Sequence, residues 1–170
     1  MNYSYLTRTI NGNHMKPSAI QLFIIRLALG ALMLHGGFEK YQEGWLCDAA
    51  PLRSSLESMQ QHASGYQLQY LDSVAIPYAS LWSKLICLGE LALGISLLLG
   101  CLVRFSTLVG MLYVLNLYAA NGMLYSLKFF ATPWAALLFS AFLALFLARA
   151  GRWVGVDAVF AKSKAKSFFW

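Results

Sequence analysis

Residues 17–40 read PSAIQLFIIRLALGALMLHGGFEK, and this stretch decides the fold. Across the 20 positions from 19 to 38, the strongly polar side chains are Gln21, Arg26 and His35. A helix rises about 1.5 Å per residue, so 20 residues cover the ~30 Å hydrocarbon layer of a bilayer. The stretch therefore predicts a membrane-spanning helix with Arg26 near mid-depth. A cation at that depth costs roughly 2.5–3.5 kcal/mol and needs a partner.

The composition also places the chain in a lipid bilayer. Of 170 residues, 59% are hydrophobic and 12% are charged, which is too apolar for an ordinary soluble domain. The net charge is +6, but the basic residues lie beside apolar runs instead of forming a patch, so nucleic acid is not an expected partner. A cleaved signal peptide is not expected either, because Arg26 interrupts a long apolar run. We expect a single membrane domain over residues 1–170.

Four apolar runs predict the architecture. They place spans at about 18–38, 76–100, 105–123 and 133–148, which indicates an all-α integral membrane protein built as a four-helix transmembrane bundle. The long outer loop, 41–75, contains a short amphipathic helix over 51–63, because apolar residues recur there at helical spacing. Its apolar edge is expected to rest on the membrane or on the spans, and a lid over a site is the alternative. Residues 149–170 form a basic C-terminal tail.

The lysines and arginines outside the spans predict the orientation. Eight fall on the side of the two termini and three on the side of the 41–75 loop. Because basic residues are enriched in cytoplasmic segments, we expect a multi-pass protein of the bacterial cytoplasmic (inner) membrane with both termini in the cytoplasm.

Polar side chains at similar depth suggest a polar layer inside the bundle. Counted from the cytoplasmic ends of their spans, Arg26 and Glu90 lie at ~12 Å and ~15 Å, and Asn116 and Ser140 fall near the same level. Small residues follow the same helix faces: Gly30 and Gly37 on the first span, and Cys87 and Gly94 on the second. We therefore predict a contact between Arg26 and Glu90. The alternative to a functional role is a buried ion pair that only fixes helix register.

His35 is a second titratable candidate. It follows Arg26 by nine residues, which turns it about 180° away on an ideal helix, so one site holding both requires the helix to loosen at Gly36 and Gly37. A proton-transfer role and an ordinary interfacial histidine are the two alternatives. Only His35 among the three histidines lies in a span, so we expect no haem, and no motif predicts a metal or a nucleotide.

Several short motifs carry a family resemblance. They are Arg26-x3-Gly30, His35-Gly36-x3-Lys40, Gly89-Glu90-x3-Gly94-x5-Gly100-x3-Arg104, Asn116 and Gly151-Arg-Trp-Val-Gly-Val-Asp157. Together they resemble the DoxX/DoxD-like family of four-helix membrane proteins, and the long first outer loop is more similar to the DoxD branch. That branch implies the membrane subunit of a thiosulfate:quinone oxidoreductase, which passes electrons from thiosulfate to quinone beside a DoxA-like partner subunit.

The sequence and the resemblance leave three alternative functions. In the first, the chain is a quinone-linked redox subunit: Arg26, Glu90 and Asn116 bind the quinone head group, and Glu90 and His35 are the candidates for catalytic proton transfer. In the second, it is a non-enzymatic scaffold of a redox or stress-response complex. The third is a small transporter, suggested by the repeat of Arg26-Leu-Ala-Leu-Gly30 in Glu90-Leu-Ala-Leu-Gly94. The sequence sets neither the substrate nor the oligomeric state.

Overall fold

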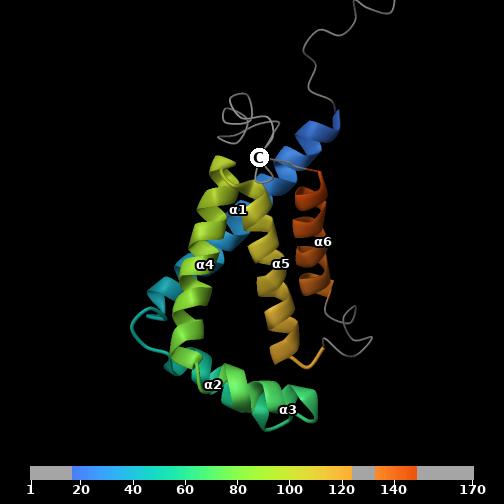
Figure 1. The fold of residues 1–170 in the computed structure, drawn as a ribbon. Helices are drawn as coiled ribbons and strands as arrows, with labels where there is room; N and C mark the ends of the chain where they lie inside the picture. Colours follow the sequence, from blue (N-terminus) through green and yellow to red (C-terminus); the bar gives the residue numbers. More distant parts are fainter. Residues whose placement is uncertain (1–16, 124–132, 149–170) are drawn as a thin grey trace, which may run out of the picture.

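A computed structural model describes residues 17–123 and 133–148, and the regular elements in these two ranges are all helical (Figure 1). Within these two ranges, three helices are long and apolar enough to cross a membrane, over Ile20–Gln42, Ala79–Leu99 and Val103–Ala120. The elements in chain order are α1 (Pro17–Gln42), α2 (Ala50–Gln60), α3 (Tyr66–Tyr70), the π-helical turn η2 (Leu71–Ala75), α4 (Ala79–Leu99), α5 (Val103–Ala120) and α6 (Pro133–Leu147).

The bounds differ from the predicted ones in two places that matter for the site. The first helix continues to Gln42, four residues beyond the predicted end at 38. The second long helix starts at Ala79 instead of 76, because the chain first passes through η2 and Pro77. At its other end Gly100 has φ +67°, a left-handed conformation that glycine adopts without steric cost and that stops α4.

α6 is shorter than the other apolar helices. Its 15 residues span about 22 Å at 1.5 Å per residue, against a hydrocarbon layer of ~30 Å. The predicted fourth span, 133–148, is thus present as an apolar helix of smaller length. The predicted basic tail, 149–170, and residues 1–16 lie outside the described residues.

The closest helix packing joins α1 to the antiparallel α4. A Cβ atom added at Gly94 would lie 2.6 Å from the Leu34 amide nitrogen, and one added at Gly37 would lie 2.8 Å from the Leu91 amide nitrogen. Side chains cannot fit at such distances, so the two backbones touch where these glycines face the partner helix. The predicted close approach along the two glycine stripes is confirmed.

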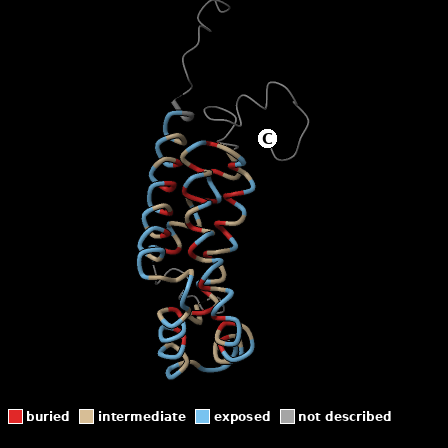
Figure 2. The backbone as a smooth tube through the Cα atoms, turned by 90° about the vertical axis from the view of Figure 1, so that its left-hand side faces the viewer, coloured by how far each residue is buried: buried red, intermediate tan, exposed pale blue. Residues whose placement is uncertain are grey.

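The bundle core forms where the inward faces of the long helices meet. Figure 2 shows buried positions along the inside of the helices and exposed ones outside. Members of this core with at most 6% exposure include Leu29, Met33, Leu97, Val114, Phe142 and Leu145. Large apolar residues such as Ile24, Leu88, Leu112 and Trp134 are exposed on the outer face, as expected for a surface in contact with lipid tails.

A second, smaller core joins the outer loop to the bundle. Leu52 and Leu56 of α2 and Leu71 of η2 are buried together with Ala79 of α4 and Ala120 of α5. We call residues 50–75 the cap. Figure 1 shows the cap across the ends of α4 and α5, at the opposite end of the molecule from the start of α1. The helix Ala50–Gln60 thus rests its apolar edge on the bundle.

Candidate functional site

Glu90 is the centre of the most connected polar cluster in the described part of the chain. It lies on α4 and is only 4% exposed. Lys40 of α1 donates to its Oε2 across 2.7 Å, and the Tyr113 hydroxyl of α5 donates to its Oε1 across 2.5 Å. Three long helices therefore each contribute one side chain to a single charge-assisted network. We call Lys40, Glu90 and Tyr113 the acid cluster.

The consecutive glycines Gly36 and Gly37 make room for this carboxylate. A Cβ atom at Gly36 would lie 3.1 Å from Glu90 Oε2, and one at Gly37 would lie 3.1 Å from the Glu90 Cβ. Lys40 follows Gly36 by one helical turn, and its ammonium group also donates to the Gly36 carbonyl at 3.4 Å. The sequence Gly36-Gly37-x2-Lys40 thus lets α1 approach the acid and then supplies its counter-charge.

The predicted contact between Arg26 and Glu90 is wrong. Glu90 pairs with Lys40, and the α1–α4 register places Gly37 opposite Glu90 and Leu34 opposite Gly94. Arg26 precedes Gly37 by eleven residues, or about 16 Å along the helix. The prediction measured the depth of Arg26 from residue 18 and the depth of Glu90 from Gly100, and it assumed that residue 18 and Gly100 lie at the same level in the membrane. Arg26 is nevertheless buried, at 1% exposure, and its guanidinium carbon lies 5.2 Å from the centre of the Phe23 ring.

Asn116 lies near the acid cluster but has a different partner. It follows Tyr113 by three residues, so the two side chains share one face of α5. Its amide nitrogen donates to the Tyr70 hydroxyl, 2.7 Å away in α3 of the cap. Burial raises the pKa of Tyr70, and the hydrogen bond from Asn116 opposes that shift in part. Tyr70 therefore keeps its hydroxyl proton at neutral pH.

His35 and Ser140 do not join this site. The His35 Nε2 atom lies 3.3 Å from Glu39 Oε1 one turn along α1, and these side chains are 73% and 60% exposed. Ser140 is exposed and donates to the Ala136 carbonyl of its own helix. The polar side chains of the four apolar helices thus do not form one layer. Of the predicted site residues, the structure brings Glu90 and Asn116 together and leaves Arg26 and His35 elsewhere.

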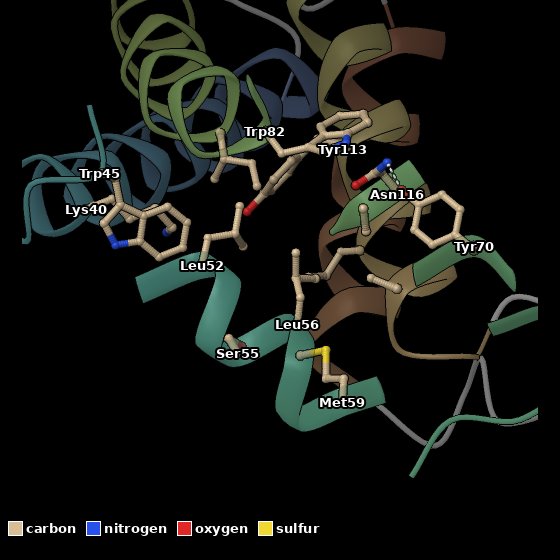
Figure 3. Close-up of a pocket in the computed structure, with 14 residues that line it drawn as sticks. Lys40, Trp45, Leu52, Ser55, Leu56, Met59, Tyr70, Trp82, Tyr113 and Asn116 are labelled. Atoms are coloured by element: carbon tan, nitrogen blue, oxygen red, sulfur yellow. Dashed lines mark hydrogen bonds between the residues drawn. The ribbon is translucent and has the colours of Figure 1, made fainter. Parts of the chain in front are cut away.

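Two adjoining cavities flank the acid cluster. The first, the outer cavity, has about 170 Å³ of volume and lies between α2 and the bundle (Figure 3). The second, the cleft, has about 600 Å³ and lies between α4 and α5. Both are lined by Trp82, Ile86, Tyr113 and Asn116. Lys40 lines the outer cavity and Glu90 lines the cleft, so their ion pair joins the two spaces.

The cleft combines an apolar wall with a few polar groups at one part of its lining. Apolar residues from both helices line it: Leu85, Ile86, Leu88, Ala92, Leu93, Val109 and Leu112. Leu85, Leu88 and Leu112 are also exposed on the outer face, so the cleft opens where lipid tails would lie. Its volume falls in the range of ligand pockets. Such a cleft suits a lipid-soluble molecule that carries a polar head group.

Sequence reasoning missed Lys40, Tyr113 and Tyr70 as members of the site. Lys40 entered the sequence analysis as a basic residue outside the spans and as part of a family motif, but not as a partner of Glu90, although it stands one turn after the Gly36-Gly37 pair. Tyr113 shares a helix face with the predicted Asn116, and that spacing was a usable signal. No sequence signal marked Tyr70, because only the folded cap brings it to α5. Within residues 17–123 and 133–148, no group of three or more His, Cys, Asp and Glu side chains could hold a metal ion.

Comparison with known proteins gives one finding about the family. The family model described as DoxX matches residues 21–121, which include α1 from its second turn, the cap, α4 and α5. All three residues of the acid cluster and Asn116 lie within the match. No curated protein and no solved structure matches the chain significantly. Because the matched region is more than half of the 170 residues, the chain belongs to the DoxX family.

Proposed function

We propose that the chain binds a membrane quinone in the cleft, as a subunit of a quinone-linked redox assembly in the bacterial inner membrane. The observation that carries this proposal is the position of the acid cluster, at the wall of an apolar cleft that opens between two lipid-facing helices. A quinone reaches its sites through the bilayer, and its ring presents polar oxygens at one end of an apolar molecule. Both properties suit this cleft.

Each polar residue has a role in this proposal. Glu90 and Asn116 contact the oxygens of the head group, and Tyr113 orients the Glu90 carboxylate through their 2.5 Å hydrogen bond. Lys40 supplies the positive charge that allows a carboxylate to remain at this depth. Arg26 and His35, the other two predicted residues, do not line the cleft and have no role in it.

The chemistry of quinone reduction needs two electrons and two protons. The electrons come, in this proposal, from a partner redox subunit, as the resemblance to the DoxD-like branch and its thiosulfate:quinone oxidoreductase suggests. Glu90 and Tyr113 are the groups at the head-group position that can hold and exchange a proton. The role of this chain is then to position the quinone and to connect its oxygens to the acid cluster.

One observation favours a second candidate, a non-enzymatic scaffold. Both carboxylate oxygens of Glu90 already accept a hydrogen bond, so the acid cluster is satisfied without any ligand. In that role the cluster only locks α1, α4 and α5 in register. The two candidates differ in one prediction, because a structural lock does not require quinone to be retained.

The proposed membrane placement is a four-helix bundle with both termini in the cytoplasm. In this arrangement α6 completes the bundle beside α5, and the cap faces outward. The eight-to-three distribution of lysine and arginine supports it. Alkaline phosphatase fused after Trp170 should be inactive, and a fusion near Ser64 in the cap should be active. The reverse pattern would overturn this placement.

Quinone extraction tests the binding proposal directly. The protein is purified from membranes in a mild detergent, and quinone per protein is quantified by chromatography after solvent extraction. We expect about one quinone per chain in the natural protein and less than a tenth of that in a Gly89→Leu variant, whose new side chain enters the cleft. Ser140→Ala on α6 is the control and should retain quinone fully. Equal retention by all three proteins would reject the cleft as the site.

A further inference from the structure

We infer that the cleft selects the reduced, dihydroxy form of its ligand, a quinol, over the oxidised quinone. The inference rests on the proposed function and concerns which hydrogen-bonding partners the cleft still offers. A quinol presents O–H donors, whereas a quinone presents carbonyl acceptors, and otherwise the two molecules have nearly the same shape. The distribution of donors and acceptors in the cleft therefore decides between them.

The donors that line the cleft already have acceptors. The Tyr113 hydroxyl donates to Glu90, and the Trp82 indole nitrogen donates to the Val74 carbonyl at 3.3 Å. The Asn116 amide nitrogen donates to Tyr70. Among the described lining residues, the second N–H of Asn116 is the side-chain donor that remains for a ligand. A quinone carbonyl would thus have to displace an existing bond or share this single group.

Acceptors, in contrast, remain in excess. Each oxygen of the Glu90 carboxylate has one bond to the protein and can accept a further one. The carbonyl oxygen of Asn116 points away from Tyr70, because the amide nitrogen of the same group holds the bond to Tyr70. Figure 3, which draws the outer cavity, shows this oxygen on the side of Asn116 away from Tyr70, and Asn116 also lines the cleft. A molecule that brings two O–H groups can satisfy Glu90 and Asn116 at once.

Charge adds to this selectivity. Glu90 is 4% exposed and pairs with Lys40, so it can act as a carboxylate inside the wall of an apolar cleft. A hydroxyl donating to a carboxylate makes a charge-assisted bond, about twice as strong as a neutral one. A quinone carbonyl in the same place would put acceptor against acceptor. Sites that hydrogen-bond a substrate hydroxyl discriminate strongly against analogues without it.

The test compares both redox forms of one short-chain benzoquinone. Isothermal titration calorimetry under argon measures binding to the purified full-length protein, with the quinol prepared by prior chemical reduction. We expect the quinol to bind at least tenfold more tightly, which corresponds to a bound-state midpoint potential raised by about 30 mV for a two-electron couple. Equal affinity or tighter quinone binding would overturn the selectivity and leave the proposed function standing. If neither form binds, the proposed function itself fails.

Two variants connect the preference to its residues. Glu90→Gln replaces a carboxylate oxygen by an amide donor, so the preference should fall below threefold. Asn116→Leu removes the second acceptor and keeps the acid cluster, so it provides the same test in a protein whose ion pair is intact. We expect it to lose part of the preference, and Ser140→Ala to lose none. An undiminished preference in both folded site variants would refute the assignment to these acceptors.

Discussion

Helix α4 meets its two neighbours in opposite ways. Toward α1 it presents Gly94, where even a methyl group would collide with the Leu34 backbone. Toward α5 it presents Leu93 and Gly89, and the two helices leave a cleft of about 600 Å³ between them. A Cβ atom at Gly89 would have no heavy atom within 4 Å apart from its own surroundings on the helix. One helix thus carries a closed interface and an open one.

The difference distinguishes Gly94, which permits close packing against α1, from Gly89, which lines the cleft. In a bilayer, helices associate through close packing because lipid tails are as apolar as the side chains they replace. The α1–α4 contact therefore stabilises the packing of the helices, and the looser α4–α5 contact leaves room for the cleft. Glu90 lies at the junction, because its ion-pair partner comes from α1 and its tyrosine partner comes from α5.

The largest effect should come from filling the closed interface. Gly94→Leu would push α1 away from α4 and break the contacts along both helices, so we expect a loss of more than about 4 kcal/mol in unfolding free energy. The measurement is SDS titration in mixed micelles, followed by circular dichroism. Gly89→Leu, five residues away on the same helix, is the matched control and should unfold near the natural protein. Similar losses in the two variants would show that the comparison of the two interfaces is wrong.

Removing the acid should have the next largest effect. Glu90→Gln leaves the Lys40 ammonium, whose side chain is 23% exposed, without its carboxylate. We expect a loss of about 3 kcal/mol, at the low end for breaking a buried pair, because Lys40 keeps some access to solvent. Adding Lys40→Met to that variant should recover most of the loss. If the double variant does not recover unfolding free energy in the same SDS titration, the Lys40–Glu90 ion pair does not link α1 to α4.

A smaller effect is expected from the bond between α4 and α5. Tyr113→Phe removes one hydrogen bond to a charged acceptor and keeps the ring, which should cost about 1.5 kcal/mol. Because this bond crosses the open interface, the variant should also bind quinone less tightly. Tyr118→Phe, on the same helix and 1% exposed, serves as a comparison for the loss of another buried tyrosine hydroxyl. A Tyr113→Phe variant unchanged in both assays would remove α5 from the acid cluster.

The smallest effect should appear away from both interfaces. Ser140 is exposed on α6 and bonds only its own helix, so Ser140→Ala should change the unfolding free energy by less than about 0.5 kcal/mol. Its quinone content should also be unchanged. A marked loss in either measurement would mean that α6 contributes to the site in a way that neither interface accounts for.

The sequence predicts the long helices and their packing faces well, because these depend on local patterns. Apolar runs place α1, α4 and α5, and the glycines on α1 and α4 mark the side on which they meet. The partner of Glu90 could not be predicted in the same way. Helix register depends on which glycine meets which backbone, and a shift of eleven residues replaces Arg26 by Gly37 opposite Glu90.

The cap accounts for the other contacts that the sequence did not predict. Trp45 and Trp82 stand far apart in the sequence, yet both line the outer cavity. Tyr70 reaches Asn116 only because η2 and α3 fold back across the end of α5. These contacts join residues far apart in the sequence, and no periodicity within one segment encodes them. Glu90 and Asn116 were predictable as polar residues inside spans, but the cavities that they line were not.

The small core beneath the cap has a consequence for synthesis of the protein. Leu52 and Leu56 leave the ribosome long before Ala120, which completes the surface on which they are buried, and Gln67 donates to the carbonyl of that same Ala120. During translation, the surface against which the apolar edge of α2 packs is incomplete until α5 has been inserted. Until then, the leucines of the nascent loop remain unburied and lie at the lipid surface or are bound by an insertion factor. A ribosome stalled before residue 120 should therefore present a protease-sensitive loop. The loop should become protected when the ribosome releases the chain.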